Sequence, residues 1–156
     1  MNETTGLLGA SDIRTIAAEA GISPTKKFGQ NFVIDPGTVR KIVRTAGVTA
    51  DSKVLEVGPG LGSLTLGLLE TGAHVTAIEI DTPVAERLPH TVATYMPAAS
   101  ERLRVIEMDA LKATPDNTTI DLSTPLTLVA NLPYNVATPI ILTLLERFTN
   151  IESFVV

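Results

Sequence analysis

The sequence predicts an α/β fold in which a mostly parallel sheet carries helices on both faces. From residue 50 onward, short apolar segments alternate with segments of helical periodicity, and this alternation is typical of parallel sheets. Residues 53–65 indicate a strand, a turn with glycine at alternate positions, and the start of a helix. In open parallel sheets such a turn follows the first strand and lies where ligands bind.

The remaining elements follow from apolar runs, cap residues and helix breakers. Strands are expected near 53–57, 73–78, 103–107 and 126–130, and a fifth begins at 154. Helices are expected behind Ser11 to about 20, behind Asp35 to about 46, over 63–70, after Pro83, and from Thr138 to about 148. Segment 113–124 is polar, which favours a surface loop.

Length and composition indicate one globular domain that can bury a sizeable core. The chain has 156 residues, 44% hydrophobic and 19% charged, which is ordinary for such a domain. It has no cysteine, which excludes disulfides, thiolate metal sites and a cysteine nucleophile. The two histidines, His74 and His90, follow no ligand-like spacing, so no metal is expected. We expect a cytoplasmic protein, because no signal peptide or membrane-spanning stretch is visible.

Charge is unevenly distributed along the chain. The formal net charge is −5, yet residues 24–47 hold five basic side chains against one acid, Asp35, a local charge of +4. These are Lys26, Lys27, Arg40, Lys41 and Arg44. A local basic face can contact phosphates even on an acidic protein. A solvated helix face is the alternative interpretation.

The spacing of the glycines separates two classes of cofactor. In the dinucleotide fingerprint Gly-x-Gly-x-x-Gly the third glycine packs helix against strand, whereas here Gly62 comes one residue early. Glu56 precedes Gly58 by two residues, and Glu-x-Gly-x-Gly-x-Gly resembles the first motif of class I methyltransferases, which bind S-adenosylmethionine. A dehydrogenase module is therefore disfavoured. A tight strand–helix connection without a ligand remains an alternative.

Two acidic residues are expected at the same edge of the sheet. Glu79 ends the second strand, 21 residues after Gly58, where an acid can accept hydrogen bonds from both ribose hydroxyls of an adenosine cofactor. Asp109 and Ala110 follow the third strand, where the carboxylate can accept from the adenine amino group. The alternatives are an ordinary strand-end acid and a turn residue.

Asn131, Leu132, Pro133 and Tyr134 follow the fourth strand and suit methylation of a nucleobase amine. An adenine amino nitrogen is a poor nucleophile because its lone pair is delocalised into the ring. The Asn131 side-chain oxygen and the Leu132 carbonyl can accept its N–H bonds and stabilise positive charge developing on nitrogen. Tyr134 can stack on an extruded base, and Pro133 stiffens the turn. A proline turn with a surface tyrosine is the alternative.

Four segments together resemble the bacterial small-subunit ribosomal RNA adenine dimethyltransferases. They are residues 24–32, 55–62, 77–81 and 131–139, in family order. The resemblance implies a class I methyltransferase that transfers four methyl groups from S-adenosylmethionine to two adjacent adenosines near the 3′ end of small-subunit RNA, during subunit assembly. It implies a cofactor site comprising Asn31, Val33, Gly58, Gly60, Glu79, Asp109, Ala110 and Asn131. Val33 departs from the family, which more often has leucine.

The resemblance also sets expectations about domains and partners. It divides the chain into a tail with a short helix, 1–22, and a partial catalytic domain, 23–156, truncated within the fifth strand and lacking the family's carboxyl-terminal helical domain. We therefore expect poor RNA methylation by this chain and a monomer in the complete protein. Two alternatives remain, an RNA-binding assembly factor in which methylation is secondary and a related large-subunit RNA methyltransferase.

Overall fold

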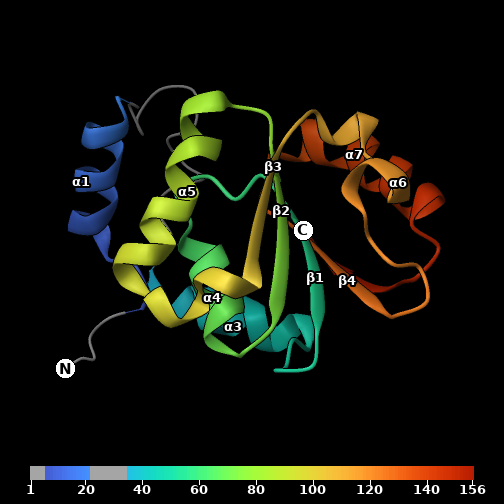
Figure 1. The fold of residues 1–156 in the computed structure, drawn as a ribbon, viewed down its shortest axis with the longest axis horizontal. Helices are drawn as coiled ribbons and strands as arrows, with labels where there is room; N and C mark the ends of the chain where they lie inside the picture. The colour runs from blue at the N-terminus through green and yellow to red at the C-terminus, as the bar shows by residue number, and fades with distance from the viewer. Residues whose placement is uncertain (1–5, 22–34) are drawn as a thin grey trace.

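The computed structural model describes residues 6–21 and 35–156, and its centre is a five-stranded, fully parallel sheet. The strands are β1 (Lys53–Val57), β2 (His74–Glu79), β3 (Leu103–Glu107), β4 (Leu126–Ala130) and β5 (Ile151–Val155). Their order in the sheet is β3-β2-β1-β4-β5 (Figure 1). The order reverses between β1 and β4, which is where open α/β sheets form a ligand-binding crevice.

Helices cover both faces of this sheet, as the sequence predicts (Figure 1). The longer ones are α1 (Ala10–Ala20), α3 (Pro36–Ala46), α4 (Ser63–Glu70), α5 (Thr82–Tyr95) and α7 (Tyr134–Arg147). The short ones are η1 (Pro97–Arg102), η2 (Ala110–Lys112) and α6 (Pro115–Thr118). The first four long helices pack on one face, and α7 with η2 packs on the other. Among the described helices none is long and apolar enough to cross a bilayer.

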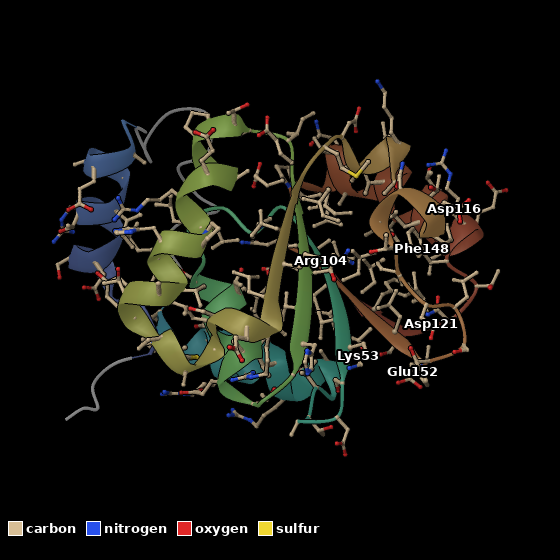
Figure 2. The ribbon with its side chains drawn as sticks, in the orientation of Figure 1. Lys53, Arg104, Asp116, Asp121, Phe148 and Glu152 are labelled. Atoms are coloured by element: carbon tan, nitrogen blue, oxygen red, sulfur yellow. The ribbon has the colours of Figure 1, made fainter. Side chains whose placement is uncertain are left out.

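Each strand feeds two cores because successive side chains point to opposite faces. On β1, Val54 joins the core beneath α3, α4 and α5, and the next residue, Leu55, joins the core beneath α7. Phe148, which follows α7, is fully buried in this second core (Figure 2). Burial on both faces explains why β4 is a nearly continuous apolar run, interrupted only by Thr127.

Two predicted helix starts are wrong. Helix α1 begins at Ala10 behind Gly9, not behind Ser11, because the Asp12 carboxylate accepts the Gly9 N–H at 2.8 Å and caps the helix there. Helix α7 begins at Tyr134, not Thr138, and contains Pro139. The Pro133 carbonyl accepts the first bonds of α7. Pro139 therefore lies only in the second turn and removes one backbone hydrogen bond.

Other boundaries also differ from the sequence prediction. Strand β2 starts one residue later than expected, and β5 starts at Ile151 rather than at residue 154. The predicted loop 113–124 contains α6, whose N-cap Thr114 accepts the Asn117 N–H at 3.1 Å. A four-residue helix has no apolar periodicity to reveal it, so only its cap residues and Pro115 could have indicated it.

Candidate active site

The glycine turn after β1 needs glycine at all three positions. The φ angles of Gly58, Gly60 and Gly62 are +73°, +59° and +105°, a region that other residues rarely adopt. A Cβ on Gly58 would lie 2.5 Å from Leu132 Cδ2, and one on Gly62 would lie 2.9 Å from Leu88 Cδ1. The turn after β1 is thus packed directly against the turn after β4 and against helix α5.

Glu79 fastens this turn to the end of β2. Its Oε1 accepts the Gly60 N–H at 3.3 Å, and its Oε2 accepts the Asp81 N–H at 3.1 Å. The side chain is buried, and burial raises its pKa although the two backbone donors act in the opposite direction. Each carboxylate oxygen can accept a further hydrogen bond, so Glu79 retains the capacity to receive ribose hydroxyls.

Asp109 and Ala110 lie at the end of β3 beside Glu79. Asp109 Oδ1 accepts the Leu111 N–H at 2.9 Å and thereby caps η2, while Ala110 is buried. Both residues line a hollow of about 190 Å³ at the carboxyl edge of the sheet. Its lining consists of Val57, Gly58, Ile78, Glu79, Ile80, Met108, Asp109, Ala110, Leu111, Leu132, Val136 and Ile140.

Apolar residues form most of this hollow, and apart from Ala110 and Leu132 they were not predicted from the sequence. Ile80 follows Glu79 directly and is 65% exposed, and Leu111 lies two residues after Asp109 and is 41% exposed. A large aliphatic residue within two positions of a strand-end acid is the sequence signal that could have identified them. With Met108 and Val136 they provide a surface suited to a flat, weakly polar ring.

Asn131 and Leu132 occupy the turn between β4 and α7. The Asn131 N–H donates to the Val57 carbonyl at 3.2 Å, which continues the β1–β4 pairing. Leu132 lines the hollow and covers Gly58, while Pro133 is exposed and precedes Tyr134, the first residue of α7. The structure therefore brings Gly58, Glu79, Asp109 and the 131–134 turn to one edge of the sheet.

Glu56, the first acid of the glycine motif, points away from this hollow into the opposite core. Its Oε1 accepts the Thr65 hydroxyl at 2.6 Å, which fastens the first turns of α4 to β1. Glu56 is fully buried, its Oε2 has no hydrogen-bond partner among the described residues, and burial raises its pKa to about 7.

The predicted basic face is only partly described. Asn31, Val33, Lys26 and Lys27 lie outside the described residues. Arg40 forms a forked ion pair with Glu70, with Nε–Oε1 and Nη2–Oε2 distances of 3.0 and 2.8 Å. Its charge is therefore compensated within the fold. Lys41 and Arg44 on the same helix are exposed.

Comparison with solved structures defines the class of protein. The 23S rRNA methyltransferase ErmE matches 77% of this chain and 45% of its own, with 30% identity and a TM-score of 0.62. A dimethyladenosine transferase from Plasmodium falciparum matches 77% of this chain and 42% of its own, with 28% identity and a TM-score of 0.57. The sheet order, the glycine turn and these similarities define a class I, Rossmann-like methyltransferase fold.

Sequence comparison narrows the class to one family. A model of the ribosomal RNA adenine dimethylase family matches residues 22–156, and the chain belongs to that family. The ribosomal RNA small subunit methyltransferase A of Bifidobacterium longum (strain DJO10A) is 70% identical over 162 residues, covering 100% of this chain and 52% of that protein. The chain spans about half the length of the curated relatives it matches.

Proposed function

We propose that this chain carries the S-adenosylmethionine site and the methyl-transfer motif of a small-subunit ribosomal RNA adenine dimethyltransferase. Family membership supports the reaction class. The name of the 70%-identical relative supports the small subunit, rather than the large subunit, as the source of the RNA. The substrate is two adjacent adenosines near the 3′ end, each dimethylated on its exocyclic nitrogen, and the partner is the immature small subunit in the cytoplasm.

One observation supports this proposal most directly: the hollow at the carboxyl edge joins Gly58, Glu79 and Asp109 to the turn that holds Asn131. The donor set suits an adenosine-type cofactor. Glu79 would receive the ribose hydroxyls, Asp109 the adenine amino group, and Ala110 N–H a ring nitrogen. Gly58 and Gly60 let the backbone approach the ligand. S-adenosylmethionine, when bound, supplies an electrophilic methyl group on a sulfonium.

The chain's own residues would then position the base. The Asn131 side-chain oxygen and the Leu132 carbonyl accept the two N–H bonds of the adenine amine, so its lone pair turns out of conjugation. Positive charge that develops on nitrogen is stabilised by these two uncharged oxygens. Tyr134 stacks on the extruded base, and Pro133 limits the freedom of the turn. Positioning accounts for most of the rate, and no general base is required.

Several parts of the proposal concern residues outside the described structure. Asn31 and Val33 would belong to an amino-terminal loop that folds over the cofactor. The division into a tail with a short helix, 1–22, and a partial catalytic domain, 23–156, remains a prediction. So do the monomeric state of the complete protein and the poor RNA methylation by this chain alone.

A cofactor titration and a transfer assay test the proposal. We expect calorimetry to detect S-adenosylmethionine binding and no NAD binding, and we expect labelled methyl to reach unmethylated small subunits more slowly than with a full-length relative. Tighter binding of NAD than of S-adenosylmethionine would contradict the cofactor assignment. An assembly factor with secondary methylation instead predicts salt-sensitive subunit binding that does not depend on Asn131. Its docking residues would be Lys26, Lys27, Arg40 and Arg44.

A further inference from the structure

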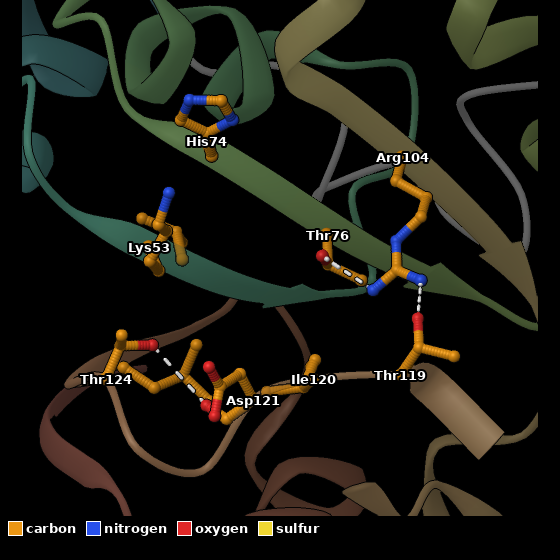
Figure 3. A pocket seen from close by; sticks show the side chains of 10 residues that line it. Lys53, His74, Thr76, Arg104, Thr119, Ile120, Asp121 and Thr124 are labelled. Carbon is orange, nitrogen blue, oxygen red and sulfur yellow. Dashed lines mark hydrogen bonds between the residues drawn. The ribbon is translucent and has the colours of Figure 1, made fainter. Parts of the chain in front are cut away.

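A second hollow lies at the amino edge of the sheet, at the opposite end of the strands from the candidate active site. It has a volume of about 250 Å³. Strands β1, β2 and β3 contribute Lys53, His74, Thr76 and Arg104 to its lining, and the segment before β4 contributes Thr119, Ile120, Asp121 and Thr124 (Figure 3). Leu126, which is buried, also lines it. We call it the amino-edge groove.

The groove exists because one face of β2 and β3 lacks a covering helix near the start of the strands. Between β3 and β4 the chain forms only η2 and the four-residue α6. Register pairs Lys53 with His74 and Thr76 with Arg104. Their side chains share the face on which Leu55 and Ile78 are buried further along the strands. Both faces of parallel strands are usually apolar and covered, so this polar patch needs an explanation.

The cations of the groove are not neutralised by acids within the described part of the chain. Lys53 is exposed and has no ion pair there. The Arg104 guanidinium donates to two uncharged groups, the hydroxyls of Thr119 and Thr76. Asp121 also lines the groove; its Oδ1 accepts the N–H and hydroxyl of Ser123 at 2.8 and 2.7 Å, and it keeps its negative charge. Two cations, Lys53 and Arg104, against this one acid leave the groove with a net charge of +1, on a chain whose net charge is −5.

Thr119 holds the Arg104 guanidinium in place. It has a φ of +53°, which is uncommon for a β-branched residue. Its hydroxyl accepts from Arg104 and also donates to the Thr118 carbonyl at 2.7 Å. The guanidinium thus bridges from β3 to the segment after α6 across the groove (Figure 3). A fixed planar donor beside an exposed lysine ammonium suits an anion with several oxygens.

We propose that the amino-edge groove binds the phosphodiester backbone of single-stranded RNA, with Lys53 and Arg104 as phosphate contacts. This inference rests on the proposed function, which makes RNA the substrate. The apolar floor, Ile120 and Leu126, gives a sugar or base a surface beside the phosphate. Five or six residues of strand span about 15–20 Å, so the groove holds a different nucleotide from the target adenosine. It would contribute affinity and orientation without reading the base.

The test measures the salt dependence of RNA binding by this chain, without cofactor. Fluorescence anisotropy with an oligouridine probe gives the slope of log Kd against log salt concentration. Lys53→Gln and Arg104→Gln should each reduce this slope by about 0.7, the value for one lost phosphate contact on a single strand. Arg14→Gln, which removes an exposed arginine of α1 far from the groove, should leave the slope unchanged. Arg104→Lys keeps the charge and should preserve the slope.

Two results would overturn the inference. One is an equal slope of RNA binding for Arg104→Gln and Arg14→Gln. If binding of a polyglutamate probe nevertheless differed between these two variants, the partner would be an acidic protein and not RNA. The other is the absence of RNA binding by the chain. Because the readout needs neither cofactor nor transfer, a failure of methylation would leave this result intact. Conversely, a salt-dependence slope that does not change in the groove variants would not contradict the proposed methyl transfer at Asn131.

Discussion

Leu132 lies directly over Gly58, and a Cβ on that glycine would come within 2.5 Å of Leu132 Cδ2 and 3.4 Å of the Asn131 carbonyl oxygen. This contact joins the turn after β1 to the turn after β4. The proposed cofactor motif and the proposed methyl-transfer motif are therefore one packed unit, although 73 residues of sequence separate Gly58 from Asn131. A substitution of Gly58 should therefore affect both the cofactor motif and the methyl-transfer motif.

The first prediction concerns Gly58→Ala. Its φ of +73° costs an alanine about 1–2 kcal/mol, and the overlap with Leu132 adds about 1–3 kcal/mol. Gly47→Ala is the matched control, because Gly47 has a φ of +72° and nothing within 4 Å of its Cβ position. Denaturant unfolding should show the larger loss for Gly58→Ala, with weaker S-adenosylmethionine binding. Equal losses in the two variants would mean that the Gly58–Leu132 contact carries no energy.

The second prediction concerns the buried Glu56, whose pKa rises from its usual 4.5 to about 7. Between these values the folded state binds more protons than the unfolded state, so the free energy of unfolding falls as pH rises through this window. At about 1.4 kcal/mol per pKa unit, the fall is at most roughly 3–4 kcal/mol.

Glu56→Gln removes this titration while keeping an oxygen for the Thr65 hydroxyl. Unfolding free energies of wild type and variant, measured by denaturant from pH 5 to pH 8, should diverge, with the variant gaining relative stability as pH rises. Taking the difference cancels the groups that titrate alike in both proteins. A difference that stays constant over this range would show that Glu56 titrates in the fold as it does in water.

The third prediction compares two aspartates in the same local geometry. Asp109 Oδ1 accepts the N–H of Leu111 at 2.9 Å, and Asp121 Oδ1 accepts the N–H of Ser123 at 2.8 Å. Alanine at either position should cost about 1 kcal/mol of stability through the lost turn bond. Only Asp109→Ala should also weaken S-adenosylmethionine binding, by about tenfold, as one hydrogen bond to the ligand is lost. Scanning calorimetry measures the stability of each variant, and titration calorimetry measures its affinity for S-adenosylmethionine. Similar affinities in Asp109→Ala and Asp121→Ala would mean that the adenine does not bind at Asp109.

Local sequence determined three of the five strands well. The bounds of β1, β3 and β4 agree with the sequence prediction, because each is a short run bounded by charged or turn residues. Helix α7 was placed four residues late because Thr138-Pro139 is a strong local start signal. In the structure the hydrogen bonds that the Pro133 carbonyl accepts and the burial of Ala137 extend the helix backward past this signal.

The contacts that assemble the site could not be obtained from sequence patterns. Glu79 was expected at the strand end, yet its bond to Gly60 joins residues 19 apart. The Gly58–Leu132 contact likewise depends on how β1 and β4 pair. Arg40 was expected on a basic face that can contact phosphates, but Glu70, on the neighbouring helix α4, compensates its charge. The spacing of a motif in the sequence predicts the edge of the sheet on which a residue lies. The residues that it contacts there depend on strand register and helix packing.

The most direct test of the proposed mechanism is Asn131→Ala, measured for both cofactor binding and methyl transfer to unmethylated small subunits. The side-chain oxygen is proposed to act on the adenine amine, and the Asn131 N–H that bonds the Val57 carbonyl survives the substitution. We predict that transfer falls at least about a hundredfold, while S-adenosylmethionine affinity changes little. Transfer at the wild-type rate by a variant that still binds the cofactor would contradict the account.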